Sequence, residues 1–86
     1  MEIDKRWTGT WWMVRNKNTN NVSITRCKPE PCGDKYLSGS WTSECKDWKS
    51  INYEEPFKHL NFPSITYEES PLEIEITETG KVYWYD

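Results

Sequence analysis

Three cysteines and the single histidine are the side chains of this 86-residue chain whose types and spacing could do chemistry. Cys27, Cys32 and Cys45 lie in the stretch CKPEPCGDKYLSGSWTSEC, and thirteen residues separate Cys45 from His59. A set of three cysteines and one histidine is chemically complete for tetrahedral zinc. Zinc ribbons, however, place two residues between paired cysteines, whereas this chain has four and no second close pair. A zinc-stabilised module is therefore an alternative, and no cofactor is the main expectation.

A disulfide between Cys27 and Cys32 would close only a small loop. The first residues, MEIDKRWTGTWW, contain acids beside bases and no apolar signal-peptide core, and no stretch of the chain approaches the length of a membrane span. We therefore expect a cytoplasmic protein, in which disulfides are rare. The thiols are expected to be free, some of them buried as small apolar side chains.

Enzymatic chemistry has little support in the sequence. His59 lies in the partly apolar run FKHLNF, and the acid pairs at 54–55 and 68–69 are sequence neighbours, which point to different sides of a strand. No nucleophile elbow, Gly-rich phosphate loop or HExxH motif is present. A chain of this size also has little room for a substrate pocket. We expect a protein that is not an enzyme.

The composition indicates a fold made mainly of β-strands in a single domain, residues 1–86. Ala and Gln are absent and Leu occurs three times, whereas the chain contains six Trp and five Tyr. Aromatic and β-branched residues favour strands, and Ala, Leu and Gln favour helices. We expect a small twisted antiparallel sheet or open barrel of four or five strands built from hairpins, mainly β or α+β with one short helix.

Two segments have the alternation of β-hairpins. The first is TGTWWMVR and NVSITRC around the turn-forming run NKNTNN, and the second is LEIEIT and KVYWYD around a turn containing Gly80. In the second hairpin Leu72, Ile74 and Ile76 are expected on the buried face. Between the hairpins we expect a loop over residues 28–44, with a strand near 36–41 and Trp41 anchored in the core. Short helical turns are expected in SECKDWKSI and in YEEPFKHLNFP.

The charges divide the chain into a basic first part and an acidic second part. Residues 1–50 contain nine Lys or Arg and six Asp or Glu, whereas residues 51–86 contain two Lys and eight Asp or Glu. An acidic segment keeps a small protein soluble and can also contact a basic partner. Thirteen aromatic residues exceed what a core of this size needs, and aromatic residues are enriched in protein interfaces. The sequence therefore favours protein binding, through a surface formed by Trp48, Glu73, Glu75, Glu78, Tyr83 and Tyr85.

A second kind of binding is an alternative. The N-terminal run KRWTGTWWMVRNK interleaves aromatic and basic residues, which is the pattern of proteins that stack and track single-stranded nucleic acid. The acidic second half would repel a phosphate backbone. The residues of this nucleic-acid interface would be Arg6, Trp7, Trp12, Arg15 and Lys17. A strand close to the C-terminus could also form a sheet edge that accepts a partner strand, including one from a second copy of the chain.

The run DWKSINYEEPFKHLNFPSITYEESPLEIEI resembles, in style and without a defined motif, the small Trp/Tyr-rich acidic orphan proteins of tailed bacteriophages. The resemblance implies a role rather than a fold. Such proteins commonly act as stoichiometric inhibitors that bind a host protein, including restriction, CRISPR and other defence factors. It implies an inhibitor acting in the host cytoplasm and transfers no individual residue.

Overall fold

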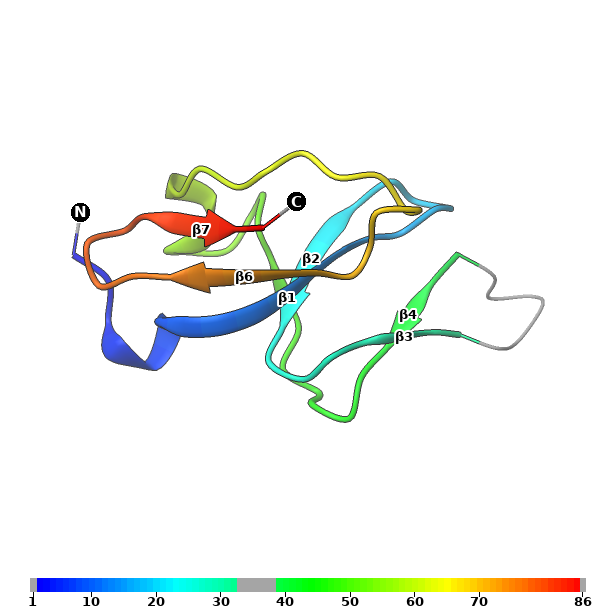
Figure 1. The fold of residues 1–86 in the computed structure, drawn as a ribbon, viewed down its shortest axis with the longest axis horizontal. Coiled ribbons are helices and arrows are strands. Elements are labelled where there is room, and N and C mark those ends of the chain that lie inside the picture. The colour runs from blue at the N-terminus through cyan, green and yellow to red at the C-terminus, as the bar shows by residue number, and fades with distance from the viewer. Residues whose placement is uncertain (1, 33–38, 86) are drawn as a thin grey trace.

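The computed structural model describes residues 2–32 and 39–85, and its regular structure is mainly strand (Figure 1). Five strands form one antiparallel sheet in the order β5-β2-β1-β6-β7, and two short strands, β3 and β4, form a separate ribbon. The sheet is open, so of the two expected architectures the antiparallel sheet is confirmed and the barrel is not formed. The elements are η1 (Lys5–Trp7), β1 (Gly9–Arg15), β2 (Val22–Thr25), β3 (Glu30–Pro31), β4 (Trp41–Thr42), β5 (Lys49–Ser50), η3 (Phe57–His59), β6 (Leu72–Ile76) and β7 (Val82–Trp84).

The first predicted hairpin is confirmed as β1 and β2, which pair antiparallel from Trp12 opposite Thr25 to Arg15 opposite Val22. Its turn is held by the Asn16 side chain, whose Oδ1 accepts hydrogen bonds from two backbone N–H groups of the turn. Asn20 adopts a left-handed φ of 64°, a conformation that Asn tolerates better than most residues. The asparagine run therefore forms the turn that the sequence predicts.

The second predicted hairpin is confirmed as β6 and β7. In the turn that connects the two strands, Gly80, at φ 85°, donates its N–H to the Thr77 carbonyl at 3.1 Å. The Thr77 N–H in turn donates to the Lys81 carbonyl at 2.9 Å. Because the turn needs a left-handed residue at this point, glycine at position 80 fixes the register of the two strands.

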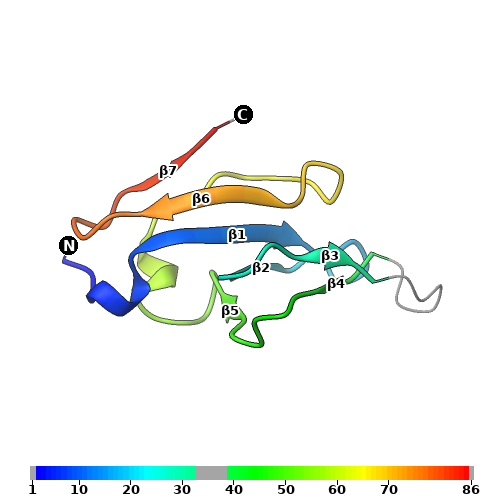
Figure 2. The ribbon, with the colours of Figure 1, turned by 60° about the horizontal axis from the view of Figure 1, so that its bottom comes forward.

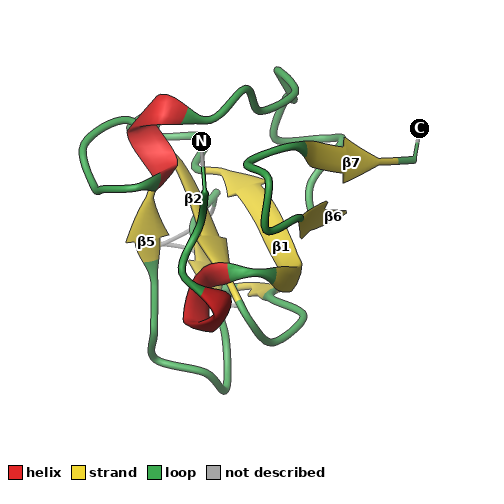
Figure 3. Ribbon diagram, turned by 90° about the vertical axis from the view of Figure 1, so that its left-hand side faces the viewer, coloured by secondary structure: helices red, strands yellow, loops and turns green. Residues whose placement is uncertain are grey.

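One face of the sheet, which we call the inner face, packs on the hydrophobic core. Trp11, Met13, Ile24, Ile74 and Ile76 project from the strands, and η1, η3 and residues 51–66 cover them (Figure 3). The Trp11 ring packs edge-on against Phe57 at 5.4 Å, and its Nε1–H donates to the Trp7 carbonyl at 3.0 Å. The core therefore connects η1 and η3 to the central strand.

Arg26 closes the other side of Trp11. Its guanidinium lies 4.0 Å from the Trp11 ring centroid and donates to the carbonyls of Thr10 and Arg6. Desolvation by these contacts lowers the pKa of Arg26, and the Asp47 carboxylate opposes that shift. A cation held over an aromatic face strengthens the packing of the central strand.

The opposite, outer face is divided into a covered half and an open half. Over β1 and β2 it is covered by the chain around the β3–β4 ribbon, and Val14, Thr25 and Pro29 are buried there. Trp41 fixes this covering segment by donating from Nε1 to the Arg15 carbonyl and by packing against Tyr67. Trp41 is thus an anchor, as expected, although it is half-buried and outside the main core.

The expectation of free thiols is wrong for two of the three cysteines. Cys27 and Cys45 form a disulfide, with their Cα atoms 5.4 Å apart, and Cys32 is free. The physical reason is the excursion of the chain through β3 and β4, which returns Cys45 to the end of β2. The Cα distance that results is typical of a disulfide. The pair considered from the sequence, Cys27 with Cys32, is not the pair that forms.

Two local predictions also need correction or qualification. The helical turn expected in SECKDWKSI is wrong, since the chain bends at residues 44–45, where Cys45 is bonded to Cys27, and then forms strand β5. The turn expected in YEEPFKHLNFP is confirmed as η3. Of the strand expected near 36–41, residues 36–38 lie outside the described residues, and Trp41 begins β4.

The disulfide can be tested by counting thiols. In denaturant without reductant we expect one reactive thiol per chain, Cys32, and three after reduction. Closing a loop with a sequence separation of 18 stabilises a fold by about 3 kcal/mol, so Cys45→Ser should lower the free energy of unfolding by about that amount. Cys32→Ser is the matched control and should leave it almost unchanged. Three thiols without reductant in the freshly purified protein would contradict the pairing.

The core contact between Trp11 and Phe57 gives a second prediction. Phe57 is fully buried, so Phe57→Ala should lower the free energy of unfolding by about 3–5 kcal/mol through lost packing. Tyr53→Ala, at a side chain that is 76% exposed in the same connection, should change it by less than about 0.5 kcal/mol. Urea unfolding followed by tryptophan fluorescence measures both. Equal losses in the two variants would refute this assignment of the core.

Candidate protein-binding surface

The open half of the outer face brings together three of the predicted partner-binding residues. Glu73 and Glu75 project from β6, and Tyr83 of β7 lies directly opposite Glu75. All three are exposed, while Ile74 between the two glutamates and Ile76 after them are buried. We call Glu73, Glu75 and Tyr83 the acidic face. Strand alternation produces it, because the residues that build the core leave their neighbours on the other side.

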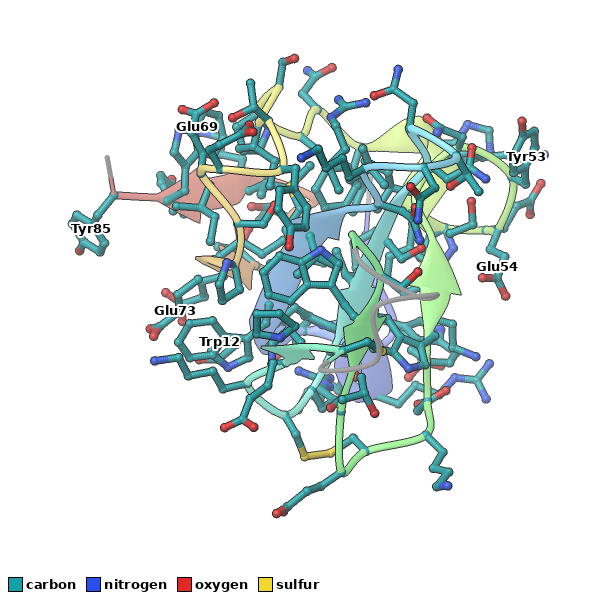
Figure 4. The ribbon with its side chains drawn as sticks, turned by 90° about the vertical axis from the view of Figure 1, so that its right-hand side faces the viewer. Trp12, Tyr53, Glu54, Glu69, Glu73 and Tyr85 are labelled. Carbon is teal, nitrogen blue, oxygen red and sulfur yellow. A yellow bond between two sulfur atoms is a disulfide. The ribbon has the colours of Figure 1, made fainter. Side chains whose placement is uncertain are left out.

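The carboxylates of the acidic face have no ion-pair partner among the residues that the structure describes. Neither Glu73 nor Glu75 forms an ion pair with any side chain in residues 2–32 and 39–85. The neighbouring sequence adds to the negative potential, since residues 61–85 contain five Glu and a single Lys. Figure 4 shows Glu69, Glu73 and Tyr85 along one side of the molecule, with Tyr53 and Glu54 on the opposite side. The segment that carries the acidic face is therefore predominantly negative, and Lys28, 5.6 Å from the ring of Trp12 opposite Glu73, is a cation beside it.

The other three predicted residues lie in different places. Tyr85 follows β7, is 90% exposed and projects away from the body beside the acidic face (Figure 4). Glu78 lies in the turn between β6 and β7, where its carbonyl accepts the Ile3 N–H. Trp48 is half-buried next to β5, at the opposite end of the sheet order from β7, and lines a cavity with Val14 and Trp41. The structure therefore separates Trp48 from the predicted surface.

The sheet ends at β7, and the side of this strand that faces away from β6 is open (Figure 2). Antiparallel pairs alternate between hydrogen-bonded and non-hydrogen-bonded positions. Because Thr77 is bonded to Lys81, the next hydrogen-bonded pair is Glu75 with Tyr83. The backbone N–H and C=O groups of Val82 and Trp84 then point away from β6. No described strand pairs with them.

Sequence reasoning missed the residues on the inner side of this edge. Val82 and Trp84 share a face, as the alternation predicts, and Val82 packs against the core. Trp84 is instead 38% exposed and lines a cavity of about 480 Å³ with Pro63, Ser64, Ile65, Glu69 and Leu72. The alternation assigned a face to Trp84, and the sheet edge expected near the C-terminus is confirmed by the position of β7 at the end of the strand order, but neither could show the cavity beside Trp84.

The residues proposed for zinc are not assembled. Cys27 is bonded to Cys45, and Cys32 follows β3, where its N–H donates to the Ser40 carbonyl. His59 ends η3, and its Nε2 lies 3.6 Å from the Glu55 carboxylate. The hydrogen bond and charge of Lys58, followed by those of His59, lower the pKa of Glu55. In the part of the chain that the structure describes, no cluster of three His, Cys, Asp or Glu side chains is suited to a metal ion.

The residues of the alternative nucleic-acid interface are distributed over both ends of β1. Arg6 and Trp7 lie on η1, and Trp7 packs edge-on against Phe57. Arg15 ends β1, where its guanidinium donates to the carbonyls of Ile65 and Asn20. The two remaining residues each contact another group: Lys17 lies 5.7 Å from the Tyr67 ring, and Trp12 lies on the outer face with Lys28 at 5.6 Å. The structure does not bring these five side chains into one groove.

In residues 2–32 and 39–85 no helix has the length and apolar character needed to span a bilayer. No protein-family model, no curated protein and no solved structure matches this chain.

Proposed function

We propose that this chain is a non-enzymatic protein-binding module that recognises a basic region of another protein through the acidic face. The observation that carries the proposal is the position of two carboxylates, Glu73 and Glu75, that pair with no described cation and lie beside exposed tyrosines on a hairpin at the edge of the sheet. Unpaired charges of one sign raise the rate at which an oppositely charged partner is captured.

The tyrosines supply apolar surface, which the carboxylates lack. Tyr83 is 54% exposed and Tyr85 is 90% exposed, so both rings can bury a large apolar area on binding. Tyrosine loses little conformational freedom when it is fixed in an interface, which is one reason why it is common among residues that dominate binding energy. The combination suits a partner surface of Lys or Arg side chains, whose apolar stems pack on aromatic rings.

The resemblance to small phage proteins extends this proposal to inhibition of a host protein, including a defence factor. A module that occupies a basic surface blocks whatever else that surface binds, and a basic surface is a frequent feature of proteins that act on nucleic acid. This step rests on the resemblance and on the charge of the acidic face. It needs no catalytic residue.

The compartment in which binding takes place is a separate question. Disulfides persist in oxidising compartments and are rare in the cytoplasm. The Cys27–Cys45 bond therefore favours a different compartment from the cytoplasmic one expected from the sequence. The acidic face lies on β6 and β7, outside the loop that the disulfide closes. The proposed binding surface therefore contains neither of the bonded cysteines.

The proposal predicts that reversing the two charges removes binding. The double variant Glu73→Lys and Glu75→Lys should weaken capture of the partner at least tenfold, because cations would then face cations. Affinity capture from lysate, quantified by mass spectrometry, identifies the partner with the native chain and measures the loss. The fold should survive, since both side chains are exposed.

A matched control has the same change of net charge elsewhere. Glu30 and Glu44 are exposed near the β3–β4 ribbon, so Glu30→Lys with Glu44→Lys should leave capture close to that of the native chain. Equal weakening by both double variants would mean that overall charge, and not the acidic face, determines binding. Retained capture by the Glu73 and Glu75 double variant would rule out the proposal.

The aromatic contribution is tested at a residue beyond the last strand. Tyr85→Ser should weaken binding of the same partner roughly tenfold by removing the ring from the interface. Tyr53 provides the control, because it is 76% exposed and lies on the opposite side of the molecule (Figure 4). Tyr53→Ser should have no effect, as measured by titration calorimetry with the purified partner. An equal effect of the two substitutions would contradict a role for the side that carries Tyr85.

A further inference from the structure

The open edge of β7 separates two surfaces of different chemistry. On the outer side it borders the acidic face, and on the inner side it borders the cavity lined by Trp84, Leu72 and Pro63. Along the edge itself, the backbone groups of Val82 and Trp84 are the ones that point outward. A strand that pairs with this edge would place alternate side chains on these two surfaces.

We propose that β7 binds an extended segment of the partner in which cationic residues alternate with apolar ones. The inference rests on the proposed function and makes it specific, because it states the conformation and the residue pattern of the bound segment. The main-chain hydrogen bonds would give affinity, and the two flanking surfaces would select the side chains.

The outer surface selects for Lys or Arg. A partner residue opposite Tyr83 lies on the same side of the extended sheet as Tyr83 and Glu75. It is two strand spacings, about 9.6 Å, from the β6 backbone. A long cationic side chain can cross the Tyr83 ring and meet the Glu75 carboxylate, gaining both a cation–π contact and an ion pair.

The inner surface selects for an apolar side chain. Partner residues opposite Val82 and Trp84 point toward the inner side, where the cavity of about 480 Å³ has walls formed by Trp84, Leu72 and Pro63. Glu69 also lines this cavity, so its carboxylate could pair with a neighbouring cation of the bound segment. An apolar side chain placed here would cover the exposed part of Trp84.

A second copy of the chain is a poorer fit for the edge. Its own β7 would present Val82, Tyr83 and Trp84, none of which carries a positive charge. Lys81, which directly precedes β7, is the one cation within residues 72–85 that a second copy would bring, and three glutamates come with it. Charge complementarity therefore favours a basic partner segment over self-pairing.

The edge can be blocked without changing any side chain. Residues 1–44 can be joined to a synthetic peptide of residues 45–86 at Cys45, which allows an N-methyl group on the backbone nitrogen of Trp84. Because this nitrogen points away from β6, the hairpin should form as before, with an unchanged thermal midpoint. The probe is a short peptide in which Lys alternates with Val. Its affinity, measured by fluorescence anisotropy, should fall at least tenfold on N-methylation, relative to the unmethylated semisynthetic chain.

Two further measurements make the result independent of that variant. A peptide of the same composition, with Lys and Val each in blocks, should bind the native chain at least tenfold less tightly than the alternating one. In the isotope-labelled native chain, the alternating peptide should slow amide hydrogen exchange at Val82 and Trp84, whose N–H groups point outward. Unchanged exchange at both residues would overturn strand pairing.

The outcomes separate this inference from the proposed function. One outcome is that Glu73→Lys with Glu75→Lys abolishes binding while N-methylation does not, and that the peptide with Lys and Val in blocks binds as tightly as the alternating one. In that case the acidic face binds the partner and the strand pairing is wrong. If N-methylation abolishes binding and charge reversal does not, the cationic pattern is wrong, and with it the proposed recognition by charge. A native chain that is dimeric in sedimentation equilibrium, and monomeric after N-methylation, would assign the edge to a second copy and overturn the proposal.

Discussion

The burial of Trp11 is the constraint on which the rest of the structure depends. The residue lies in the central strand, and its ring is packed against Phe57 on one side and the Arg26 guanidinium on another. The hydrogen bond from Nε1 to the Trp7 carbonyl satisfies the one polar atom of the ring, which an apolar core would otherwise penalise. Because these partners come from η1, η3 and the end of β2, a single side chain fixes the position of four elements. A domain of this size has few aliphatic residues to share that task.

The outer face of the sheet is covered over only part of its area. The chain around the β3–β4 ribbon covers β1 and β2, where the Trp41 hydrogen bond and the Cys27–Cys45 disulfide hold it. The covering segment does not extend over β6 and β7, so one face of these two strands is exposed to solvent. The proposed binding surface is thus the part of the sheet for which the described chain forms no second layer. Its chemistry follows from the glutamates and tyrosines that alternate with buried isoleucines.

Local patterns predicted the elements well, and the distant contacts poorly. The asparagine turn and the Gly80 turn are signals contained within a few residues. Both hairpins, and the face of the sheet on which Ile74 lies, could therefore be predicted from the sequence. The pairing of β1 with β6 joins Trp12 to Glu73 across some sixty residues, and no local pattern encodes it. The same limit explains the error about the cysteines, because the return of Cys45 to Cys27 depends on the path of the ribbon. It also explains Trp48, whose distance from β7 follows from strand order alone.

The location of the charges helps to distinguish a binding edge from a protected one. Proteins commonly guard an edge strand by placing a charge on the strand itself, which prevents uncontrolled pairing with other chains. Here β7 carries Val82, Tyr83 and Trp84, and the carboxylates lie one strand further in, on β6. From that position they leave the backbone of the edge accessible, and they attract cations to the surface beside it. Protection by charge would have the opposite order, with a charged edge and a neutral neighbour. The observed order favours an edge that admits a partner and discriminates by charge which partner it admits.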